Sequence, residues 1–173
     1  MPRVFPAAAA ALLAMAACTP TFNWREITVG EAALHATFPC KPDRAERKVP
    51  FTRERELLVH AAGCEAGGAS YAVLWADVGS PAELATALAQ WRQASLATSR
   101  ASVEREEPFQ PRGALAQPPP AMVRATGRRA DGAAVKSQAA YFARGNVVFQ
   151  AVVFAPVLRA EMSEPFFAGL RFE

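Results

Sequence analysis

Residues 57–77 read LLVHAAGCEAGGASYAVLWAD, and this stretch contains two predicted strands with a turn between them. Mostly apolar runs cover 57–64 and 69–77, and Gly67 and Gly68 lie between them. Glycine readily adopts the positive φ that a tight turn needs, so the pattern predicts a β-hairpin. Both alternating sets of residues in the second run are apolar, which is typical of a central strand covered on both faces.

An amphipathic helix is predicted directly after the hairpin, over 81–98. Ser80 can cap it, Pro81 suits the first helical position, and Glu83 can complete a capping box with Ser80. One stripe of the helix is apolar and comprises Leu84, Leu88 and Trp91. Such a stripe packs on a sheet. Because it holds no polar group to orient a ligand, core packing is the preferred interpretation and the lining of a pocket is the alternative.

Three further strands are predicted over 121–129, 133–143 and 147–154. The first two are separated by Asp131-Gly132 and the last two by Gly145-Asn146, and both pairs are strong turn signals. The last strand is apolar on both faces, like the second strand of the hairpin. The pattern therefore predicts an antiparallel meander.

The remaining segments are less regular. Alternation over 33–39 predicts a half-buried strand, and the charged segment 43–56 is interpreted as an exposed connection with a short edge strand around 48–52. The polar, proline-rich segment 101–120 is expected to be an irregular loop. A short helix over 157–168 contains Pro165, so it either kinks there or begins only at residue 163.

The N-terminus has the layout of a secretory signal peptide. One basic residue, Arg3, precedes an apolar run that is shorter than the roughly 20 residues of a membrane span. Small residues, Ala16 and Ala17, then precede Cys18, and this arrangement resembles a bacterial lipoprotein signal. The resemblance implies cleavage before Cys18 and lipidation of Cys18. It also implies an outer-membrane protein facing the periplasm, because Thr19 follows the cysteine. Simple secretion to the periplasm is the alternative.

The resemblance to a lipoprotein signal also suggests different roles for the three cysteines, Cys18, Cys40 and Cys64. Lipidation of Cys18 would leave one pair in an oxidising compartment, so a Cys40–Cys64 disulfide is expected. Closing a loop of this size would stabilise the fold by roughly 3 kcal/mol in the chain-entropy model. A metal site that adds His35 and His60 is the alternative, but neither cysteine has a partner at metal-ligand spacing.

Charge and motifs restrict the function classes. The chain has 173 residues and a net charge of +3 with interspersed charges, so nucleic acid is not an expected partner. There is no G-x-S-x-G nucleophile motif, and Gly67-Gly68 lacks the spacing of a phosphate-binding loop. Glu104, Glu106 and Glu107 lie among arginines and are interpreted as a solvated charge run. We therefore expect no catalytic residue, no cofactor, no bound metal and no enzymatic activity.

The predicted order of elements is similar to that of the PsbP-like fold. The resemblance covers about residues 24–172 and includes the Phe38-Pro39 pair after the first predicted strand. It implies an α+β protein in which an antiparallel sheet of about six strands is flanked by a long capped helix and a short C-terminal helix, as an αβα sandwich. Small bacterial lipoproteins share this fold.

The expected organisation is a signal peptide at 1–17, a tether at 18–26 and one globular domain at 27–173. Phe22 and Trp24 in the tether are expected to pack on the core, with contact to the lipid surface as the alternative. The leading functional hypothesis is a non-catalytic, lipid-anchored periplasmic protein that binds or stabilises an envelope protein complex. The alternative is a carrier of a small ligand, held in a pocket between helix 81–98 and the sheet.

Overall fold

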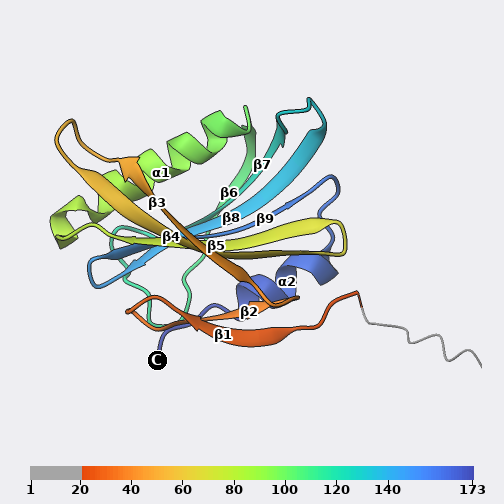
Figure 1. Cartoon of the computed structure of the whole chain (residues 1–173), viewed down its shortest axis with the longest axis horizontal. Helices are drawn as coiled ribbons and strands as arrows, with labels where there is room; N and C mark the ends of the chain where they lie inside the picture. Colours follow the sequence, from red (N-terminus) through yellow and green to blue (C-terminus); the bar gives the residue numbers. More distant parts are fainter. Residues whose placement is uncertain (1–20) are drawn as a thin grey trace, which may run out of the picture.

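A seven-stranded antiparallel sheet forms the centre of the computed structural model, which describes residues 21–173 (Figure 1). In order across the sheet, the strands are β3 (Asp43–Pro50), β4 (Glu56–Ala66), β5 (Ala69–Asp77), β9 (Val147–Ala155), β8 (Ala134–Arg144), β7 (Ala121–Arg128) and β6 (Ser102–Pro108). The protein is therefore α+β with an antiparallel sheet, as the sequence predicts, but the sheet has more strands than the expected six.

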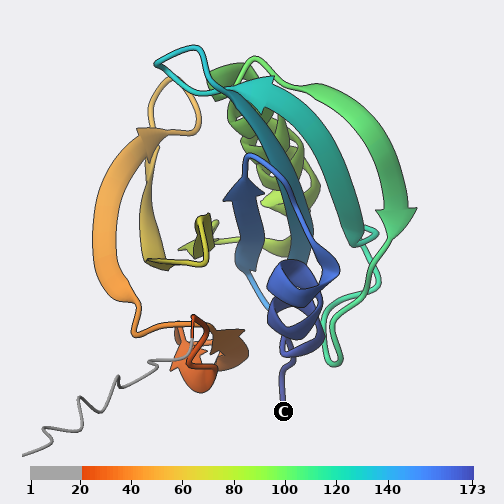
Figure 2. The ribbon, with the colours of Figure 1, turned by 90° about the vertical axis from the view of Figure 1, so that its right-hand side faces the viewer.

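The two faces of the sheet are covered by different elements (Figure 2). Helix α1 (Leu84–Thr98) lies on one face, after a short 3-10 turn at Pro81–Glu83. The other face is covered by helix α2 (Ala160–Ala168) and by a separate hairpin of β1 (Arg25–Val29) and β2 (Leu34–Phe38). The helices thus lie on opposite sides of the sheet.

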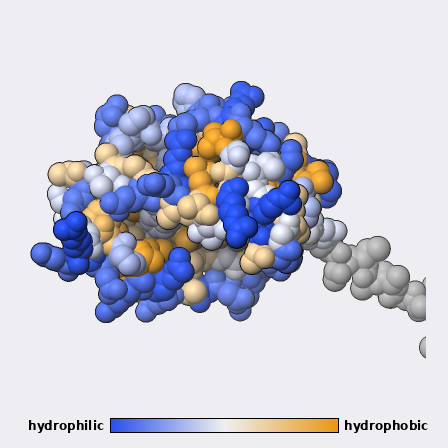
Figure 3. Space-filling view, turned by 90° about the horizontal axis from the view of Figure 1, so that it is seen from above, coloured by the Kyte–Doolittle hydropathy of each residue, from blue (hydrophilic) through white to orange (hydrophobic). Residues whose placement is uncertain are grey.

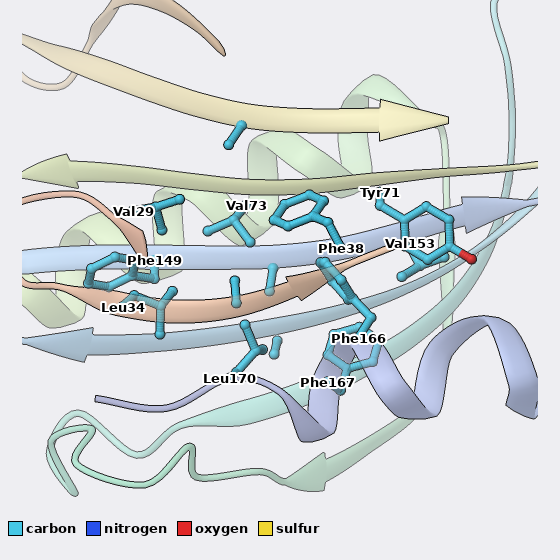
Figure 4. Packing of buried hydrophobic residues seen from close by; sticks show 14 of the residues in the cluster. Val29, Leu34, Phe38, Tyr71, Val73, Phe149, Val153, Phe166, Phe167 and Leu170 are labelled. Atoms are coloured by element: carbon cyan, nitrogen blue, oxygen red, sulfur yellow. The ribbon is translucent and has the colours of Figure 1, made fainter. Parts of the chain in front are cut away.

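The protein has a hydrophobic core on each face of the sheet. The larger core lies between the sheet on one side and the β1–β2 hairpin and α2 on the other (Figure 4). Tyr71 of β5 and Phe149 of β9 point into it from the sheet, and Phe38 and Phe166 enter it from β2 and α2. Phe166 makes edge-on contacts with both Phe38 and Tyr71, at centroid distances of 5.4 and 5.5 Å. Such aromatic contacts add to the stabilisation from burial alone.

The predicted hairpin and meander are confirmed. β4 and β5 pair antiparallel up to Ala66 and Ala69, and the two glycines between them both have positive φ. β7, β8 and β9 follow one another as predicted, and β9 then pairs with β5 in the middle of the sheet. Strands that are apolar on both faces therefore occupy central positions.

Both edge strands differ from the expectation. The segment 101–120, expected to be a loop, contains β6, and the segment 43–56 contains an eight-residue strand, β3, rather than a short one around 48–52. The exposed side chains of β3 and β6 are mostly charged or polar. Edge strands commonly carry such residues, which discourage pairing with other chains but hide the alternating apolar pattern.

The start of the domain also differs. β1 begins at Arg25, inside the expected tether, and Phe22 and Trp24 pack against the larger core. Ser80 caps the helical turn through a hydrogen bond from the backbone N–H of Ala82. Glu83 makes no capping box, because its carboxylate pairs with Arg55 at 2.7 Å instead.

Helix α2 begins at Ala160 and includes Pro165 in its interior. The alternative start at residue 163 is therefore wrong. Among residues 21–173, no helix has both the length and the apolar character that a membrane span requires.

Candidate ligand-binding cleft

Helix α1 leaves part of its side of the sheet uncovered. The helix packs on β8 and β9, mainly through the buried side chains of Leu84, Ala87 and Leu88. Between α1 and strands β3, β4, β5 and β9 lies a cleft of about 940 Å³, called the α1 cleft below. Figure 3 looks down on this side of the protein and shows apolar residues in the hollowed middle of a largely hydrophilic surface.

On the side away from the cleft, α1 is held by contacts with β6 and β7. The two guanidinium nitrogens of Arg92 donate to the two carboxylate oxygens of Glu106 on β6, both at 2.7 Å, and these hydrogen bonds lower the pKa of Glu106. At the end of α1, the N–H of Arg128 donates to the carbonyl of Ser99 at 2.7 Å. A side chain at Gly127 would collide with that carbonyl. These contacts hold the C-terminal half of α1 toward β6 and β7.

Apolar side chains line the floor and one wall of the α1 cleft. Ala72 and Leu74 of β5 and Phe154 of β9 face the cleft and are only half-buried, although both strands are central. Trp91 on the predicted helical stripe lines the opposite wall and is also half-buried. Leu84 and Leu88 are buried in the core and Trp91 packs against it, as expected for the stripe, although Trp91 also lines the cleft.

A buried polar group lies in the floor of the cleft. Gln150 of β9 is 3% exposed, and its amide nitrogen donates to the Ser95 hydroxyl at 3.1 Å and to the Tyr141 hydroxyl at 3.2 Å. Burial raises the pKa of Tyr141, so this hydroxyl stays neutral at physiological pH. Gln150 was not among the site residues predicted from the sequence. The signal was present as one amide within the apolar run VVFQAVVFA.

The rim of the cleft is mostly basic. Arg47 and Lys48 of β3 lie along one side, and Arg128 and Arg129 lie at the β7–β8 turn. Glu65 is the one carboxylate among the described lining residues, and it accepts a hydrogen bond from Ser70 at 3.0 Å. An apolar interior with a few polar groups and a charged rim is the usual make-up of a small-molecule site.

The structure contains the expected Cys40–Cys64 disulfide, with the two Cα atoms 6.1 Å apart. The bridge joins the end of the β1–β2 hairpin to β4 of the main sheet, outside the α1 cleft. Cys18, the expected lipidation site, lies outside the described residues.

The two histidines occupy separate places. His35 on β2 contacts Glu26 through Nδ1 at 3.0 Å and Glu173 through Nε2 at 3.2 Å, whereas His60 on β4 stacks on Trp75. Both are thus engaged by protein groups and neither joins the cysteines. Within residues 21–173, no three histidine, cysteine or acidic residues come together as a metal site would require.

The carboxylates of 104–107 do not form a paired acidic site. Glu106 binds Arg92, and Glu107 lies 2.8 Å from Arg105 and 3.7 Å from Arg124. Each of these two carboxylates is therefore matched by arginine, and both belong to the β6 edge of the sheet and not to the α1 cleft.

Comparison with known proteins identifies a solved structure with a partial alignment and no sequence family. No family model matches the chain, and no curated protein matches it with statistical significance. The crystal structure of a protein of unknown function, PA94 from Pseudomonas aeruginosa, aligns with a TM-score of 0.43 and 15% sequence identity. The alignment covers 82% of this chain and 89% of that one.

Proposed function

We propose that this protein is a non-catalytic carrier that holds a small apolar molecule in the α1 cleft. The observation that carries the proposal is the incomplete cover of the central strands. Leu74 and Phe154 face Trp91 across a space of about 940 Å³ and remain half-buried. Each Å² of apolar surface left in water forgoes about 25 cal/mol of stabilisation, so a ligand that covers these side chains would bind favourably.

The volume and the polar groups fit the same proposal. Ligand sites in proteins commonly measure roughly 300–1,000 Å³. Ser95 and Gln150 hydrogen-bond to each other and, through Gln150, to Tyr141, so they form a satisfied polar patch within an apolar floor. A satisfied patch of this kind lets an apolar molecule enter without stranding a buried polar group.

A neutral fluorescent probe can test binding in the cleft. With Cys18→Ser in the full chain, so that the protein is purified without detergent, N-phenyl-1-naphthylamine should bind with a rise in fluorescence. Ala94→Trp fills the cleft from α1 and should weaken binding at least tenfold. Ala89→Trp is the matched control, because Ala89 is exposed on the same helix but does not line the cleft.

The outcome that contradicts the proposal is equally plain. If the probe does not bind, or if both tryptophan variants bind it as the parent does, the α1 cleft is not a ligand site. Circular dichroism spectra of the two variants should match that of the parent, which separates loss of binding from loss of folding.

The anchored location belongs to the same proposal. We infer a mature protein lipidated at Cys18 and attached to the periplasmic face of the outer membrane, with secretion as the alternative. The PsbP-like sandwich is also retained only as a proposal, supported by helices on both faces of the sheet.

An envelope protein partner stays a prediction with less support. The well-exposed large apolar side chains among the described residues are Leu58, Val103 and Val157, on β4, on β6 and before α2. β4 and β6 lie toward opposite edges of the sheet, so Leu58 and Val103 do not form the joint patch that a protein interface needs.

A further inference from the structure

The basic rim bears on the chemistry of the ligand, and this inference rests on the proposed function. We propose that the α1 cleft binds a long-chain carboxylate, with the acyl chain along α1 and the carboxylate at the β7–β8 turn beside Arg129. Four cationic residues, Arg47, Lys48, Arg128 and Arg129, line the cleft, against the single carboxylate of Glu65. The cleft therefore carries a positive charge that attracts an anionic ligand.

At the β7–β8 turn, Arg129 is the cation available to hold the head group. Its neighbour Arg128 already donates from Nη1 to the carbonyl of Gly132 at 3.0 Å. The side chains of Arg129, Arg47 and Lys48 have no hydrogen bond or ion pair within the described residues 21–173, and of these three only Arg129 lies at the β7–β8 turn. Elsewhere on α1 and on the approach to it, arginines such as Arg92 and Arg55 are paired with glutamates at 2.7 Å. The planar fork of the Arg129 guanidinium can bind a carboxylate through two hydrogen bonds.

The two ends of the cleft differ in polarity. The end at the β7–β8 turn is lined by Thr98, Ser99 and the two arginines, and the sheet register places Glu65 toward the same end. The opposite end, at the β3–β4 connection, is lined by Phe51 and Leu57, and Lys48 lies close to it on β3, paired with Leu58. Figure 1 shows the β7–β8 turn and the β3–β4 connection at opposite ends of the molecule. Because Phe51 and Leu57 lie at one end and two arginines with two hydroxyl groups lie at the other, we place the acyl chain toward β3–β4 and the carboxylate at the β7–β8 turn.

The length of the wall fits one acyl chain. The helical part of the lining extends from Ala87 to Ser99, which corresponds to roughly 18 Å at 1.5 Å per residue. The hydrocarbon core of a bilayer is about 30 Å thick and contains two chains end to end, so one chain spans about 15 Å. An acyl chain can thus lie along α1 and bring its head group to the turn.

The test compares ligands that share a chain and differ in charge. Palmitate and hexadecanol are titrated into the Cys18→Ser protein by displacement of N-phenyl-1-naphthylamine, with circular dichroism to verify folding. Palmitate should bind more tightly than hexadecanol. Arg129→Gln should weaken palmitate binding by about two- to fivefold, the size expected for one exposed charge pair, and leave hexadecanol unchanged. Lys136→Gln, on β8 outside the cleft, removes the same charge and should change neither affinity.

The other possible results of these titrations would contradict either the carboxylate proposal or the proposed function. Equal binding of palmitate and hexadecanol, or an unchanged palmitate affinity in Arg129→Gln, would overturn the carboxylate proposal and leave the carrier function standing. Tighter binding of palmitoyl lysophosphatidic acid than of palmitate would replace the carboxylate by a phosphate head group and also overturn it. Failure of both palmitate and hexadecanol to displace the probe would show that the cleft does not take acyl chains. Failure of the probe itself to bind would instead refute the proposed function.

Discussion

At the scale of single residues, the two buried tyrosines differ in whether their hydroxyl groups have a hydrogen-bond partner. Tyr71 is 1% exposed, and its hydroxyl is the buried side-chain polar atom without a hydrogen-bond partner among the described residues. Tyr141 is also buried, but its hydroxyl accepts a hydrogen bond from Gln150 at 3.2 Å. A buried hydroxyl without a partner costs free energy that a phenyl ring does not.

The substitution Tyr71→Phe should therefore leave stability unchanged or raise the free energy of unfolding by up to about 1 kcal/mol. Tyr141→Phe is the matched control and should lower it by about 1 kcal/mol, because it removes a partner of Gln150. Urea denaturation of both variants measures the difference. A loss of stability in Tyr71→Phe as large as that in Tyr141→Phe would mean that the Tyr71 hydroxyl has a partner after all.

Alkaline pH provides a second measurement on the same variant. Burial raises the pKa of Tyr71 to about 12, against the smaller opposing effect of the positive charge on Arg159. In the unfolded chain a tyrosine titrates near pH 10. Above about pH 10 the folded protein therefore holds a proton that the unfolded chain has released, and stability falls as pH rises. In Tyr71→Phe this fall should be shallower than in the parent, as thermal unfolding between about pH 9 and pH 11 would measure.

At the scale of elements, the disulfide joins two parts of the fold that backbone pairing does not connect. The β1–β2 hairpin is a separate two-stranded sheet, and Cys40 follows it while Cys64 lies in β4 of the main sheet. The bridge spans 24 residues of sequence. In the unfolded chain it removes the entropy of that loop.

We expect Cys40→Ser to lower the free energy of unfolding by roughly 3 kcal/mol, with a corresponding fall in melting temperature. In the denatured, unreduced proteins, alkylation followed by peptide mapping should modify Cys64 in the variant and neither Cys40 nor Cys64 in the parent. If both residues are already alkylated in the parent, the bridge does not form in the cell.

At the scale of the whole molecule, ligand binding by the domain and lipid anchoring at the N-terminus can be tested separately. The cleft is formed by residues 21–173, whereas the proposed lipid anchor would depend on Cys18. Two lipid chains hold a protein stably on a membrane, and one chain holds it only marginally. A lipidated carrier would therefore remain at the membrane surface while its cleft stays available to ligand.

Metabolic labelling in a bacterial host with an alkyne analogue of palmitate can test the anchor. The parent should take up the label, and Cys18→Ser should lose it entirely. Cys64→Ser should keep the label, since that cysteine belongs to the disulfide. An unlabelled parent protein, or a mature chain that begins at Ala17, would show that the protein is secreted without a lipid.

The sequence by itself determined the elements whose signals lie between near neighbours. The Gly67-Gly68 turn, the alternation in β4 and β5, the meander of β7 to β9 and the Ser80 cap all depend on residues a few positions apart. The compartment and the pairing of Cys40 with Cys64 were expected from the first eighteen residues and the cysteine count, and the structure contains the bridge.

Only the tertiary structure decided where the helix lies and which residues form the edges. The β6 strand is charged and is recognisable only from its pairing with β7, and the offset of α1 depends on contacts such as Arg92 with Glu106. Ser95 and Gln150, in the α1 cleft, are 55 residues apart in sequence. A cleft is the space left when distant segments pack against one another, and no local pattern of residues specifies how completely a helix covers a sheet.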